Sequence, residues 1–70
     1  MSDIITIHVN DEPAVLPAGA TLNDLPAHFG LNPETVVMLL NGEPVPREAW
    51  PERSLADGDA VDLARFVGGG

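Results

Sequence analysis

The stretch "IITIHVNDEPAVLP", residues 4–17, decides how the chain begins to fold. Its first six residues are mostly β-branched and place Ile5, Ile7 and Val9 on one face, which predicts a strand with that face in a core. The turn formers "NDEP" follow, and "AVLP" then predicts a short second strand of a hairpin. The chain therefore begins with two antiparallel strands that share an apolar face.

A helix is expected to cover this hairpin. Thr21 is followed three residues later by Asp24, as in a variant of the capping box. Leu22, Leu25 and Phe29 have the spacing of one helical face, which predicts a helix of two to three turns.

The boundaries of this helix and of the next strand depend on local signals. Pro26 predicts that the helix begins near Asn23 or is bent, because proline beyond the first turn removes a backbone donor. Gly30 is the residue type that ends a helix in the left-handed conformation. The run "VVMLLN" is then apolar on both faces, which predicts a strand buried on both sides or one whose outer face serves a partner. Asn41 and Gly42 predict a turn after it.

The second half of the chain predicts an irregular segment and a final strand. Val45, Trp50 and Leu55 are the apolar residues through which the proline-rich segment would pack. The turn "ADGD" follows, and "AVDLARFV" then alternates. Its core face would hold residues 61 and 63, and its outer face residues 62, 64 and 66.

The order of these elements predicts an α+β domain. A helix between strands supplies the connection that a parallel crossover needs, so one main helix packed on a mixed sheet of four to five strands is the economical architecture. The expected domain covers residues 1–67, and residues 68–70 form a flexible glycine tail.

Composition limits the function classes. Seventy residues suffice for one domain, which buries only about 60% of its unfolded surface, so a deep active site is not expected. The net charge of −8 would repel nucleic acid and anionic membranes. There is no cysteine, no leader segment is apparent and no run is long enough to span a membrane, so a cytoplasmic location is expected.

Few side chains suggest catalysis. His8 and His28 lie twenty residues apart without further ligands near them, so a metal site is not expected. Asp57 and Asp59 flank a glycine and are interpreted as turn residues rather than as an acid and base pair. Serine occurs only at Ser2 and Ser54, which are expected in a mobile terminus and a polar loop, so a nucleophilic triad is not expected.

The three terminal glycines are the remaining chemical feature. Gly68, Gly69 and Gly70 would span about 10 Å when extended, with no side chain to block entry into a narrow slot. The α-carboxylate of Gly70 is a poor electrophile until an enzyme converts it to a mixed anhydride such as an acyl-adenylate. The alternative is a terminus that is merely disordered.

Several stretches together resemble the ThiS family, the sulfur carriers of thiamine (thiazole) biosynthesis. They are "HVNDEPAVLPAGATLNDL", "NGEPVPREAW", "LADGDAVDL" and the terminal "FVGGG". "ADGD" and a terminal di-glycine occur in ubiquitin-like carriers in general, whereas "VPR" with Trp50 three residues on is typical of the thiamine branch. The resemblance covers nearly the whole chain and implies a ubiquitin-like β-grasp fold.

The resemblance also implies a mechanism and partners. Gly70 would be adenylated by an E1-like adenylyltransferase that uses ATP, and then converted to a thiocarboxylate with cysteine-derived sulfur. A thiazole synthase would accept the sulfur, with Gly68 and Gly69 threading into both partner active sites. The chain would then be a protein cosubstrate without catalysis of its own, and it would bind no cofactor.

Phe66, Trp50 and Arg47 each have two interpretations. Strand alternation places Phe66 on the outer face beside the tail, where an exposed aromatic residue indicates partner docking, although local packing over the sheet edge is the alternative. Trp50 is interpreted as core packing. Arg47 is expected to pair with a carboxylate on the surface or on a partner.

Other functions stay open at this level. One is a sulfur carrier like the small subunit of molybdopterin synthase, and another is a ubiquitin-like modifier whose Gly70 forms an isopeptide. A binding module with an inert tail is a third possibility. An independent small enzyme ranks last because the sequence offers no nucleophile or ligand cluster.

Overall fold

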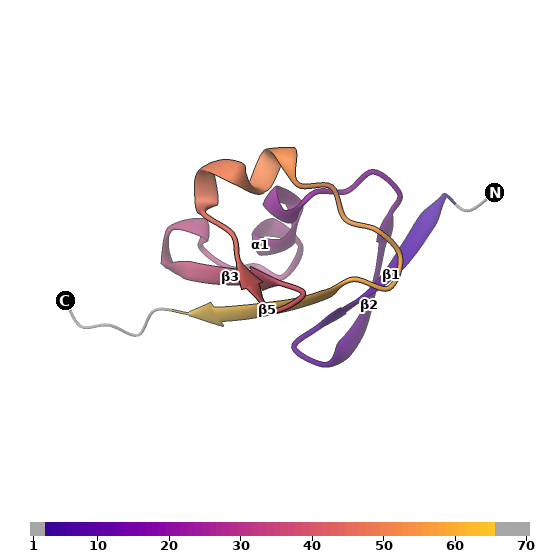
Figure 1. Cartoon of the computed structure of the whole chain (residues 1–70), viewed down its shortest axis with the longest axis horizontal. Helices are drawn as coiled ribbons and strands as arrows, with labels where there is room; N and C mark the ends of the chain where they lie inside the picture. Colours follow the sequence, from indigo (N-terminus) through magenta and orange to yellow (C-terminus); the bar gives the residue numbers. More distant parts are fainter. Residues whose placement is uncertain (1–2, 66–70) are drawn as a thin grey trace.

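The last strand of the chain lies in the middle of the sheet. The computed structural model describes residues 3–65, which form a five-stranded sheet in the order β2-β1-β5-β3-β4 (Figure 1). The strands are β1 (Ile4–Val9), β2 (Glu12–Pro17), β3 (Val36–Leu40), β4 (Glu43–Pro44) and β5 (Ala60–Arg65). β5 pairs in parallel with β1 and antiparallel with β3, so the predicted mixed sheet is confirmed.

Short helices cover one face of this sheet (Figure 1). They are η1 (Leu22–Asp24), α1 (Leu25–His28), η2 (Pro33–Thr35) and η3 (Arg47–Glu52). The Asp24 carboxylate accepts the Thr21 backbone N–H at 2.9 Å, so the predicted cap forms. Pro26 falls in the first turn of α1, where its missing N–H costs little.

The helical segment is shorter than its apolar spacing predicted, and the last of the three apolar residues does not face the core. Leu22 and Leu25 are fully buried, but Phe29 is 41% exposed. The predicted single face fails because η1 is a 3₁₀ turn, whose three residues per turn change the direction of the side chains that follow. Gly30, with φ at +68°, ends the segment as predicted.

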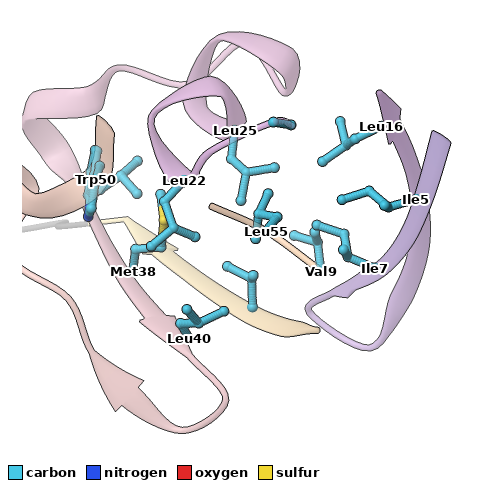
Figure 2. Close-up of a cluster of buried hydrophobic side chains, with 13 residues drawn as sticks. Ile5, Ile7, Val9, Leu16, Leu22, Leu25, Met38, Leu40, Trp50 and Leu55 are labelled. Carbon is cyan, nitrogen blue, oxygen red and sulfur yellow. The ribbon is translucent and has the colours of Figure 1, made fainter. Parts of the chain in front are cut away.

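The core lies between the sheet and the helices (Figure 2). Its buried side chains are Ile5, Ile7, Val9, Leu16, Ala20, Leu22, Leu25, Val36, Met38, Leu40, Trp50, Leu55 and Val61. Trp50 is 1% exposed and its indole N–H donates to the Val45 carbonyl at 3.0 Å, which confirms the predicted packing role. The largest side chain of the core is thus held by a hydrogen bond as well as by contacts.

Replacement of Leu25 tests this description of the core. We expect Leu25→Ala to lower the free energy of unfolding by about 2–5 kcal/mol, because the residue is fully buried and its removal leaves a cavity. In a domain of this size the melting temperature should fall by about 10 °C or more. Val15→Ala is the control, since Val15 is 56% exposed. Equal melting temperatures for the two variants would contradict the assignment of Leu25 to the core.

Candidate functional site at the end of strand β5

The candidate site is the end of β5, the strand that leads to the glycine tail. Leu63 packs against the core, while Asp62 and Ala64 are exposed on the opposite face, as the alternation predicted. Phe66, Gly68, Gly69 and Gly70 lie outside the described residues, so their assigned roles stay predictions. The structure therefore describes how the strand that precedes the tail is held in the sheet.

Asn10 holds β5 from the side of β1. Its backbone N–H donates to the Val61 carbonyl at 2.9 Å. Its side chain then bonds twice to Leu63, because the Leu63 N–H donates to Oδ1 at 2.9 Å and Nδ2 donates to the Leu63 carbonyl at 3.2 Å. The side-chain amide thus replaces the peptide group that β1 no longer supplies, and it extends the parallel ladder beyond the end of β1.

Asn41 holds β5 from the side of β3. Its backbone N–H donates to the Ala60 carbonyl at 2.7 Å, and its Oδ1 accepts the Ala60 N–H at 3.0 Å. Both Asn10 and Asn41 have φ at +51°, a conformation that asparagine tolerates better than most residues. The two turns that flank the sheet therefore place equivalent amides on opposite sides of β5.

Asp57 and Asp59 hold the turn that precedes β5. Asp57 Oδ1 accepts the Thr6 N–H at 2.8 Å, and Asp59 Oδ2 accepts the Ala56 N–H at 2.8 Å. These bonds join the turn to β1 and close it on itself. The interpretation of both carboxylates as turn residues is confirmed.

An apolar surface borders β5 on the face opposite the helices. Val37 pairs with Ala64 and Leu39 pairs with Asp62 in the β3–β5 ladder, and their side chains point away from the core. Val37 is 37% exposed. We refer to Val37, Leu39 and Ala64 as the outer patch. The continued alternation of β5 would place position 66 on the same face.

A hollow of about 340 Å³ lies on the other face beside the end of β5. Its lining residues are Val9, Asn10, Glu12, Phe29, Leu31, Leu63 and Arg65. The exposed Phe29 contributes to this hollow instead of to the core, and its ring meets His28 edge to face at a centroid distance of 4.9 Å. Surfaces that could contact another molecule therefore flank β5 on both faces.

Other chemical candidates do not assemble into a site. His8 is exposed on β1 opposite Pro13, and His28 lies at the end of α1. Within residues 3–65, no group of three or more His, Cys, Asp or Glu side chains could hold a metal ion. The same residues contain no helix that is long and apolar enough to cross a membrane.

Two solved structures of proteins similar to this chain define its fold class. The crystal structure of the thiamine biosynthesis protein ThiS from Geobacter metallireducens matches with a TM-score of 0.81 and 32% identity, over 94% of this chain and 100% of that chain. An NMR solution structure of a thiamine biosynthesis protein from the same organism matches with a TM-score of 0.73, covering 94% and 88%. With its helices on one face of a mixed five-stranded sheet, the chain has the ubiquitin-like β-grasp fold.

The sequence comparisons identify the family. The ThiS family model matches residues 3–70, so the chain belongs to the ThiS family, as its motifs predicted. The sulfur carrier protein ThiS of Bacillus subtilis is 36% identical over 50 residues, which are 71% of this chain and 76% of that protein. The sulfur carrier protein ThiS of Escherichia coli is 30% identical over 61 residues, which are 87% and 92%.

A third relative is much longer. A thiazole synthase from Magnetococcus marinus is 36% identical over 64 residues, which cover 91% of this chain but 20% of that protein. The chain therefore spans about a fifth of the length of this relative, whereas it spans most of the two sulfur carriers.

The roles of Asn10 and Asn41 were not predicted from the sequence beyond their turns. The sequence predicts only a turn at Asn10, yet its side chain bonds to a residue 53 positions away. The available signal was an asparagine directly after a strand at a turn, which allows a positive φ and leaves an amide beside the next strand. The identity of the strand that lies next to this amide depends on the order of the strands in the sheet.

Replacement of Asn10 by glycine tests its hold on β5. Asn10→Gly should lower the free energy of unfolding by about 1–2 kcal/mol, because two side-chain hydrogen bonds are lost while the positive φ is tolerated. Asp11→Gly is the matched control: it too has a positive φ, at +68°, in the same turn. We expect this control to stay within about 0.5 kcal/mol of the original chain in urea unfolding. Equal losses in both variants would assign the effect to the turn and not to the amide.

Proposed function

We propose that the chain is a sulfur carrier for thiazole formation in thiamine biosynthesis, and that Gly70 carries the sulfur as a thiocarboxylate. The observation that carries the proposal is the family match, which runs from residue 3 through residue 70 and so includes all three glycines. Two relatives named as sulfur carrier proteins support it.

The proposed chemistry solves the problem of an unreactive carboxylate. The Gly70 carboxylate attacks the α-phosphate of ATP, pyrophosphate leaves, and an acyl-adenylate forms. A sulfur nucleophile at the oxidation level of sulfide then displaces AMP and leaves the thiocarboxylate. Sulfur is more nucleophilic than the oxygen it replaces, so the modified terminus can attack an electrophilic carbon of the acceptor.

Both steps are assigned to partner proteins. The two carboxylates of the turn before β5, Asp57 and Asp59, accept backbone N–H groups and serve that turn. We infer that an E1-like adenylyltransferase supplies the ATP site and that cysteine is the origin of the sulfur. A thiazole synthase as acceptor is supported by the Magnetococcus marinus thiazole synthase, which contains a stretch similar to this chain. The carrier itself would contribute no catalysis.

The structure suits delivery of a tail. β5 is bonded on both sides as far as Leu63, where the Asn10 side chain holds it, and by β3 alone from there to the Val36–Arg65 pair. Residues 68–70 carry no side chains, so the proposed tail has the width of a bare backbone over about 10 Å. In this proposal the tail would reach a partner's active site while the domain stays on the partner's surface.

The outer patch is proposed as the docking surface for these partners, with Phe66 as its aromatic anchor. The patch lies beside β5, and burial of its three apolar side chains would contribute affinity. The exposed Asp62 shares this face and pairs with Leu39, so a basic group of the partner would complement it. Docking there would set the direction in which the tail enters.

Intact mass measures the modification of Gly70 directly. After incubation with ATP, a cysteine-derived sulfur source and the activating enzyme, the chain should gain the mass difference between sulfur and oxygen. A variant that lacks Gly70 should gain nothing and should fail to support thiazole formation. Covalent conjugates without the sulfur-substituted chain would instead assign the protein to the ubiquitin-like modifiers, and thiazole formation by the truncated variant would contradict the role of Gly70.

A charge in the outer patch tests the docking surface. Val37→Asp should weaken binding to the activating enzyme by about tenfold or more, because a carboxylate in an apolar contact must lose its hydration. Val15→Asp is the matched control, since Val15 is 56% exposed on the same face but lies on β2, across the sheet from β3. Similar losses for both variants, measured by calorimetry with folded proteins, would rule out the outer patch as the centre of docking.

A further inference from the structure

Asn41 differs from the other asparagines of the chain in the residue that follows it. The carboxamide of an asparagine can be attacked by the backbone nitrogen of the next residue, and a side chain on that residue hinders the attack. Asn41 is followed by Gly42, which has no Cβ. Asn10 and Asn23 are each followed by an aspartate, and Asn32 is followed by a proline, which has no backbone N–H. The sequence therefore favours this reaction at Asn41.

The reaction exchanges ammonia for water. The Gly42 nitrogen gives up its proton and forms a bond to Cγ of Asn41, and ammonia leaves, which closes a five-membered succinimide ring. Water then breaks one of the two C–N bonds of the ring. Opening at Cγ gives aspartate, whereas opening at the backbone carbonyl gives isoaspartate, whose main chain runs through Cβ. Both residues are exposed, so water has access to the ring.

The folded backbone at Asn41 opposes ring closure. The ring forms only when Cβ and the next backbone nitrogen lie on the same side of the Cα–C bond. Asn41 has φ at +51°, which belongs to the left-handed region, where ψ is about +30 to +60°. Because the bonds at Cα are tetrahedral, Cβ then lies nearly opposite the Gly42 nitrogen. The chain must leave this conformation before the ring can close.

Hydrogen bonds to the start of β5 hold Asn41 in this conformation. Its Oδ1 accepts the Ala60 N–H at 3.0 Å, and its Nδ2 donates to Asp59 Oδ1 at 3.3 Å. Its backbone N–H donates to the Ala60 carbonyl at 2.7 Å. Rotation of Asn41 into the geometry of ring closure therefore requires that these contacts with β5 and its turn break.

We propose that Asn41 is a deamidation site that the fold protects, and that it reacts when its contacts with Asp59 and Ala60 are broken. The four asparagines differ in the residue that follows them, and Asn41 is the one whose carboxamide also holds β5. The reaction needs only water, so it proceeds without an enzyme. Its extent would measure how long a molecule has spent with β5 detached.

The products do not restore the original contacts. A carboxylate in place of the carboxamide still accepts the Ala60 N–H, but it has no proton to donate to Asp59 and brings a second negative charge to that carboxylate. Isoaspartate also adds one atom to the main chain of the turn between β3 and β4. Modification would thus favour further detachment of β5. The proposal does not depend on the sulfur chemistry.

Deamidation rates of the folded and the unfolded chain test the proposal. The full chain is incubated in mildly alkaline buffer, with and without denaturing guanidinium chloride. Cleavage after Glu34 and Glu48 then isolates residues 35–48, in which Asn41 is the one asparagine. Mass spectrometry gives the fraction of this fragment whose amide has become an acid. We expect the reaction to be about tenfold or more slower in buffer, because only the opened molecules react.

A synthetic peptide of residues 35–48 is the control for the solvent, because it is too short to form the sheet and should react at the same rate in both solutions. Equal rates for the full chain in both solutions would overturn protection by the fold. In the unfolded chain, deamidation within residues 1–34 as fast as within residues 35–48 would overturn the assignment to Asn41, since the other three asparagines lie in that fragment.

The variant Asn41→Asp measures the effect of the aspartate product on the fold. Its melting temperature should fall by about 4–8 °C, because a hydrogen bond to Asp59 is lost and two carboxylates meet there. Asn23→Asp is the matched control, since Asn23 is exposed in η1 and the substitution adds the same charge. An equal fall in both variants would overturn the effect assigned to the contact with Asp59.

Discussion

The hydrogen bonding of β5 on both sides is the interaction on which the rest of the structure depends. β5 joins the β1–β2 hairpin to the β3–β4 hairpin, which make no ladder with each other in the sheet order β2-β1-β5-β3-β4. Its parallel ladder with β1 includes only His8 with Ala60 and Val9 with Val61. The side chain of Asn10 lengthens this short ladder to Leu63, and Asn41 completes the opposite side at Ala60. Without the hydrogen bonds of β5 to both neighbours, the two hairpins would share a core but would not belong to one sheet.

This arrangement also explains how so small a domain can present a reactive terminus. The strand that leads to residues 66–70 is the central one; it is bonded from the side of β1 up to Leu63 and from β3 up to Arg65. The outer patch lies on one face of this strand and the hollow with Phe29 and Arg65 on the other. The net charge of −8 disfavours association between copies of the chain.

Much of the fold was predictable because it follows from local alternation. The inward positions of Val61 and Leu63 and the burial of Trp50 follow from period-two patterning and from the scarcity of large side chains. Phe29 was predicted wrongly because a 3₁₀ turn and a short helix do not keep the 3.6-residue period over eight residues. The Asn10 bonds were out of reach for a different reason. They depend on which strands become neighbours, and no local pattern encodes a contact between residues 10 and 63.

Native-state hydrogen exchange of the Leu63 amide tests the central claim most directly. If the Asn10 side chain holds β5 as described, this amide should exchange only through global unfolding, with the same free energy as the amide of the buried Ile7 in β1. Exchange of Leu63 at the rate of an open amide, while Ile7 stays protected, would contradict the account. It would mean that β5 frays before Leu63 and that the tail begins from a loose strand instead of a fixed one.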